Sequence, residues 1–150
     1  MKNSIKFYEK GSIEILYGQS SHCFPLHSHE SFCVGVLIKG TALFNINNNK
    51  RLLKESMAFI VPSNTGISIT ADSEYNYIII CFKNQLKKRV ENIKFNKYFF
   101  EMKFFEEILL LCDSFKKNND EDRLLNSIIK LISSAIEPNS LLERNKSNEI

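Results

Sequence analysis

HSHESFCVGVLIKG, residues 27–40, is the stretch of sequence that decides the fold. His27 and His29 stand two residues apart, and side chains at that spacing on a β-strand project to the same face. An apolar, β-rich run follows them and ends at Gly40, which supplies a turn. Two imidazoles on one strand face can converge inside a closed β-structure. They can act there as metal ligands, as a structural hydrogen-bonded pair, or as contacts for a small molecule.

Short β-rich runs separated by turn residues extend on both sides of this stretch, as far as residue 82. Residues 41–46 alternate, with Ala42, Phe44 and Ile46 on one face, and the triplet Asn47-Asn48-Asn49 follows as a turn. The predicted strands are residues 12–17, 32–38, 41–46, 57–61, 67–70 and 75–82. About eight short strands without intervening helices predict an antiparallel barrel or double sheet.

The hydrophobic period changes after Phe82. Residues 83–97 carry six basic side chains against one acidic one, which indicates a solvent-facing connector or short helix. Apolar residues then recur at helical spacing over residues 98–117 and 121–136, and Pro138 ends the second helix. The chain therefore divides into a barrel at 1–82, a helical segment at 83–137, and a polar linker from 138 to 150.

The apolar arcs of the two predicted helices are wide. Such arcs would leave an exposed patch too large for a solitary domain, which predicts that the helices form the surface of a homodimer. The predicted dimerisation residues are Phe104, Phe105, Ile108, Leu109, Leu111, Leu125, Ile128 and Ile132.

Composition excludes several classes of protein. A chain of 150 residues with 43% hydrophobic content is long enough for one domain with a real core. A net charge of +3 is too small to predict tight binding of duplex DNA by this chain. The first residues lack a signal peptide, no run is long enough for a membrane helix, and the four cysteines form no CxxC pair. We expect a cytoplasmic protein with buried, inert, reduced thiols.

Residues 27–40, together with ALFNI at 42–46 and MAFIVPSNTG at 57–66, resemble the N-terminal domain of AraC-type transcription regulators. The resemblance covers about residues 20–82. It implies a cupin-like antiparallel β-barrel (a jelly roll, or double-stranded β-helix) followed by two α-helices. It also implies a small-molecule effector, a homodimer, and a signal passed to a helix-turn-helix domain. That DNA-binding domain is absent from this chain, which we expect to end where the domain begins.

The sequence departs from the metal-binding members of the cupin group. Their metal-ligand Glu falls at Cys33 or Val34 here, and their later His falls at Gly66. Pro62-Ser63-Asn64 also replaces the family's Asn-Pro-Gly. Two of the ligands that the resemblance implies are thus absent, although Cys33 could join His27 and His29 around a soft metal. We expect no metal, no cofactor and no enzymatic activity.

An effector would bind in the mouth of the barrel, where apolar walls and a few polar groups converge. The predicted ligand-binding residues are Tyr17, His27, His29, Phe32, Phe44, Tyr75 and Tyr77. Because the predicted interior carries little charge, we expect an apolar or weakly polar effector. Two alternatives remain open at this point: a stand-alone metal-dependent cupin enzyme, and a protein-interaction module whose barrel binds nothing.

Overall fold

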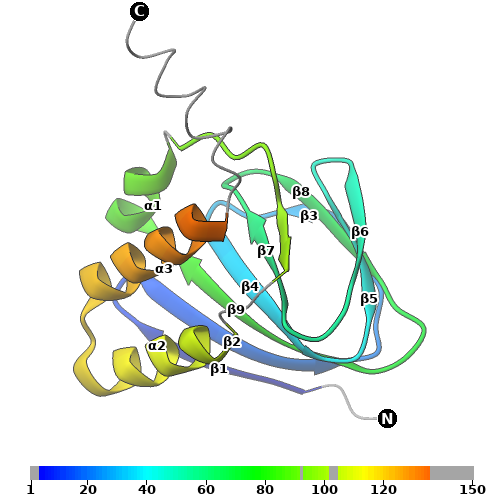
Figure 1. Ribbon diagram of the computed structural model, residues 1–150, viewed down its shortest axis with the longest axis horizontal. Coiled ribbons are helices and arrows are strands. Elements are labelled where there is room, and N and C mark those ends of the chain that lie inside the picture. The colour runs from blue at the N-terminus through cyan, green and yellow to red at the C-terminus, as the bar shows by residue number, and fades with distance from the viewer. Residues whose placement is uncertain (1–3, 92, 102–104, 136–150) are drawn as a thin grey trace, which may run out of the picture.

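The computed structural model describes residues 4–91, 93–101 and 105–135, with side chains as far as residue 133. Two antiparallel sheets face each other, and three helices lie on the outer side of the larger sheet (Figure 1). This arrangement confirms the predicted fold class, a mainly antiparallel β-barrel with C-terminal helices. No helix in the described part of the chain is both long and apolar enough to span a membrane.

The larger sheet has six strands and the smaller sheet has four. In spatial order, the larger sheet contains β1 (Ser4–Lys10), β2 (Ile13–Ser20), β9 (Tyr75–Phe82), β4 (Phe32–Lys39), β7 (Met57–Val61) and β10 (Phe99–Glu101). The smaller sheet contains β3 (Phe24–Ser28), β8 (Gly66–Thr70), β5 (Ala42–Ile46) and β6 (Asn49–Leu53). All six predicted strands are present; β1, β3, β6 and β10 were not predicted.

The helices are α1 (Asn84–Glu91), α2 (Phe105–Asn118) and α3 (Glu121–Ala135). Helix α1 confirms a short helix within the basic segment. The predicted helix at 98–117 is wrong at its start, because residues 99–101 form strand β10 on the edge of β7. Phe99 is buried on the barrel side of this strand and Phe100 on the helix side, so the alternation of a strand buries both rings. Phe104, Pro138 and the predicted linker lie outside the described residues.

Alternate side chains of the larger sheet enter two separate cores. On β4, Phe32, Val34 and Val36 belong to the core between this sheet and the helices. Cys33 and Leu37 belong to the core between the two sheets. The central strands of the larger sheet are therefore buried on both faces.

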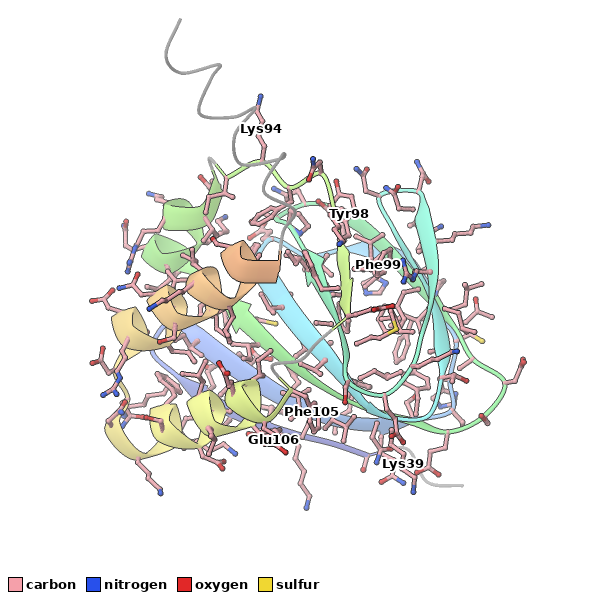
Figure 2. All side chains as sticks on the ribbon, in the orientation of Figure 1. Lys39, Lys94, Tyr98, Phe99, Phe105 and Glu106 are labelled. Carbon is pink, nitrogen blue, oxygen red and sulfur yellow. The ribbon has the colours of Figure 1, made fainter. Side chains whose placement is uncertain are left out.

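The apolar arcs of α2 and α3 are buried within one chain. Four of the predicted dimerisation residues are buried in the helix-side core: Ile108, Leu125, Ile128 and Ile132. Three more are partly buried and pack against that core: Phe105 (labelled at the start of α2 in Figure 2), Leu109 and Leu111. The larger sheet therefore covers the apolar faces of α2 and α3 that were predicted to form the dimer surface. Leu110, which is 66% exposed, is the large apolar side chain that α2 leaves on the surface.

Gly35 of β4 is required by a close aromatic contact. A Cβ atom at this position would overlap the ring of Phe59, which crosses Gly35 from the adjacent strand. We expect Gly35→Ala to force this ring aside and to lower the free energy of unfolding by about 1–3 kcal/mol, measured by chemical denaturation. Gly66→Ala is the matched control, because a Cβ there meets only the exposed side chain of Leu26, at 3.1 Å. Equal losses in both variants would contradict the assigned contact.

Candidate ligand-binding cavity

A cavity of about 390 Å³ lies between the two sheets. Its walls combine strands of both sheets with the segment that joins β3 to β4. The lining residues are Ile5, Glu14, Leu16, Phe24, His27, His29, Ser31, Cys33, Phe44, Phe59, Val61, Ile67, Ile69, Tyr77, Ile79, Cys81 and Lys83. Most of these side chains are aliphatic or aromatic, and the polar ones are few.

Cross-strand pairs of the larger sheet build one wall of the cavity in rows. The outer row runs across β2, β9, β4 and β7 through Glu14, Cys81, Cys33 and Val61. The next row inward runs across the same strands through Leu16, Ile79, Gly35 and Phe59. The wall therefore changes from partly polar to apolar between one row and the next.

Two tyrosines fill the inner end of the barrel. Tyr77 lines the cavity, and its ring lies over Gly18, where a Cβ atom would overlap it. Behind it, the fully buried Tyr75 donates a hydrogen bond from its hydroxyl to the carbonyl oxygen of His22, at 3.1 Å. Burial raises the pKa of Tyr75 to about 12, so it remains a neutral donor. The two tyrosine rings therefore occupy this end of the space between the sheets.

The histidine pair lies at the outer end of the cavity. The rings of His27 and His29 meet edge to face with their centroids 4.8 Å apart. His27 donates from Nδ1 to the carbonyl oxygen of Pro25, at 2.8 Å. Partial burial, and then the proximity of His27, lower the pKa of His29. His29 is consequently a neutral imidazole at pH 7, able to donate or accept a hydrogen bond.

The charged residues at this end form a compensated cluster. Lys83 places its Nζ 3.1 Å from a carboxylate oxygen of Glu14 and 3.1 Å from one of Glu9. Hydrogen bonds to the two carboxylates raise the pKa of Lys83. Since Lys83 and Glu14 both line the cavity, its outer end offers one cationic donor and one anionic acceptor beside the imidazoles of His27 and His29.

Four of the predicted ligand-binding residues line this cavity: His27, His29, Phe44 and Tyr77. Three do not. Tyr75 lies behind Tyr77, whereas Tyr17 and Phe32 project to the helix side of the larger sheet.

The alternation of side chains along a strand explains the two residues on the helix side. It turns Leu16 and Cys33 into the cavity instead of their neighbours Tyr17 and Phe32. Lys116 of α2 places its Nζ 4.2 Å from the ring centroid of Tyr17. Phe32 stacks on Phe95 with the ring centroids 5.7 Å apart.

Sequence reasoning missed the cysteine pair, the ion pair and most of the aliphatic lining. The missed polar residues lie on three different strands, or just past the end of one, and are distant in sequence: Cys33, Cys81, Glu14 and Lys83. One signal was present: once Tyr77 is placed inside, the strand period also places Ile79 and Cys81 there. The expectation that all cysteines are buried is wrong for Cys23, which is exposed.

The donor set does not favour a metal centre. Among the described residues, no three His, Cys, Asp or Glu side chains are grouped so that they could hold one ion. Cys33 lies instead beside Cys81, with 3.1 Å between the two sulfur atoms. The chemistry that the cavity offers is therefore apolar contact along its depth and hydrogen bonding at its outer end.

Comparisons with known proteins agree with this architecture. The sequence profile of the AraC-like ligand binding domain matches residues 11–145. No curated protein has a sequence that matches this chain.

Several solved cupin structures resemble the fold. A cupin superfamily protein from Desulfitobacterium hafniense is 10% identical over 55% of this chain and 79% of its own, with a TM-score of 0.52. An RmlC-like cupin with a double-stranded β-helix fold, from Methanocaldococcus jannaschii, is 15% identical over 59% and 85%, with a TM-score of 0.51. The cupin domain of Schizosaccharomyces pombe Cnp3 is 15% identical over 63% and 72%, with a TM-score of 0.50. At these identities the likeness shows the cupin fold alone.

Proposed function

This chain belongs to the AraC-like ligand binding domain family, and we propose that it senses a small-molecule effector bound in the cavity between its two sheets. One observation carries the proposal. A cavity of about 390 Å³ is walled mainly by apolar side chains, and its charged groups and imidazoles gather at one end. Small-molecule sites in proteins have volumes of this order and this distribution of polarity.

The lining favours a mostly apolar effector with one polar end. Phe44, Phe59 and Ile79 would contact the apolar body of such a molecule, because they line the deeper part of the cavity. Its polar group would face His29 and Lys83, which also line a groove that continues outside along α1. Charge compensation within the cluster of Lys83 disfavours a polyanion, since the lysine already contacts two carboxylates.

We propose a binding role for the cavity and not a catalytic one. Cys33 and Gly66 stand at positions where a metal-dependent cupin would need carboxylate or imidazole ligands. The Nδ1 of His27 donates to a carbonyl of its own strand, which orients the ring. The replaced ligand positions therefore favour hydrogen bonding to an effector over activation of a substrate.

The larger sheet provides a route by which an effector would be sensed at the surface. Cys33 faces the cavity, while its neighbours Phe32 and Val34 pack against the helix-side core. An occupant that favours one position of this strand would therefore bias the positions of α2 and α3. We propose that the helices pass this bias to a homodimer partner and to a DNA-binding helix-turn-helix domain outside this chain. That role would place the protein in the cytoplasm.

Ligand binding can be tested before the effector is identified. Native mass spectrometry of the chain purified from a bacterial host, followed by thermal melts in metabolite fractions, should identify a stoichiometric compound that raises Tm. An effector at 100 times its Kd would add about 2.7 kcal/mol to the free energy of unfolding. Stoichiometric metal together with turnover would contradict the proposal in favour of an enzyme. Failure of every fraction to shift Tm would favour an interaction module.

A further inference from the structure

Cys33 and Cys81 form a dithiol in the wall of the cavity. They are directly opposed on the adjacent antiparallel strands β4 and β9. Their sulfur atoms lie 3.1 Å apart, and both side chains line the cavity. The other two cysteines lie elsewhere, since Cys23 is exposed and Cys112 is buried in the helix-side core.

The distance between the sulfurs favours a covalent bond over a shared metal ion. Two thiolates on a tetrahedral zinc ion, each about 2.3 Å from it, stand well over 3.1 Å apart. No third ligand completes such a site among the residues that the structure describes. A disulfide needs a separation of about 2.05 Å between the sulfur atoms and about 4.4–6.8 Å between the Cα atoms, and directly opposed residues on antiparallel strands meet the second requirement.

We propose that Cys33 and Cys81 are an oxidation site, which hydrogen peroxide entering through the cavity converts into a disulfide. The cavity is the route of entry, because Cys33 is only 3% exposed yet lines it. This inference does not depend on the identity of the effector.

The surroundings assign different roles to the two thiols. A hydrogen bond from Cys81 lowers the pKa of Cys33, and a further one from Ser31, whose Oγ lies 3.5 Å from the sulfur, acts in the same direction. The same pairing, together with burial, raises the pKa of Cys81. Cys33 is therefore the attacking thiolate and Cys81 the resolving thiol.

The reaction balances with the peroxide as the only oxidant. The Cys33 thiolate attacks one peroxide oxygen and the O–O bond breaks. The leaving hydroxide takes up a proton, so Cys33 becomes a sulfenic acid and one water forms. The Cys81 thiol then attacks the sulfenic sulfur, an S–S bond forms, and the hydroxyl leaves as a second water. The two thiols lose two electrons and two protons, and hydrogen peroxide is reduced to two waters.

Intact-mass spectrometry and peptide mapping after treatment with hydrogen peroxide test this proposal on the unmodified chain. We expect a loss of two hydrogen atoms, one cross-linked peptide pair joining Cys33 to Cys81, and full reversal by dithiothreitol. Cys23→Ser and Cys112→Ser should retain the cross-link. Oxidation confined to Cys23, with Cys33 and Cys81 still alkylatable after denaturation, would overturn the proposal.

Two further variants test the order of attack. Cys81→Ser should accumulate a sulfenic acid at Cys33 that dimedone traps, because the resolving thiol is gone. Cys33→Ser should yield no trapped adduct at Cys81. The reverse pattern would overturn the assigned roles, while the peptide map of the unmodified chain tests the disulfide even if either variant fails to fold.

Discussion

Replacing Ile128 by aspartate is expected to unfold the domain, whereas replacing Leu110 by aspartate should leave it folded. Ile128 is 0% exposed and lies in the core between α3 and the larger sheet. An unpaired carboxylate at this position would cost more than about 4 kcal/mol, a large fraction of the stability of a small domain. Leu110 of α2 is 66% exposed, so its replacement should change the free energy of unfolding by no more than about 0.5 kcal/mol. Circular-dichroism melts measure both effects.

The same pair of variants separates a role in the fold from a role in dimerisation. If the proposed homodimer uses the exposed side of α2, the unmodified chain should sediment as a dimer and Leu110→Asp as a folded monomer. A folded, monomeric Ile128→Asp protein would show instead that Ile128 serves the dimer and not the core. Sedimentation equilibrium, performed beside the melts, distinguishes these results.

The strand pattern of the barrel was predictable, but the direction of the side chains was predictable only on strands that alternate. Ala42, Phe44 and Ile46 alternate with polar or exposed residues, so their common face is evident from the sequence and is buried in the structure. Residues 32–37 are apolar on both faces because both faces of the larger sheet are covered. The sequence of such a strand does not indicate which of its two faces points into the barrel. The assignment of Phe32 to the mouth therefore had no support in the sequence pattern.

Other elements depended on partners distant in sequence. Strand β10 has three residues and is specified by its pairing with β7, not by a local signal. Strand β3 contains Pro25, which is compatible with its position at the edge of the smaller sheet but obscures it in the sequence. Cys33 and Cys81 are opposed only because the register between β4 and β9 places them so. Spacing along the chain contains none of this information.

The largest effect on effector binding is expected from filling the cavity at Ile79. This side chain lies in the apolar row of the wall, between Leu16 of β2 and Gly35 of β4. A tryptophan there would extend into the empty volume and occupy the space that an effector needs. We expect Ile79→Trp to fold and to weaken effector binding at least 100-fold, which corresponds to about 2.7 kcal/mol. Isothermal titration with the compound identified by native mass spectrometry measures this loss.

Leu52→Trp is the matched control for the same added side chain. Leu52 is 50% exposed and does not line the cavity, so a tryptophan there should leave the effector affinity unchanged. Equal loss of affinity in the two variants would point to a general effect of the substitution. Undiminished binding by a folded Ile79→Trp protein would place the effector outside the barrel. If the apolar rows of the larger sheet form the effector site, the effector affinity should fall in Ile79→Trp alone. In that variant, and not in Leu52→Trp, the added ring competes with the ligand for the same volume.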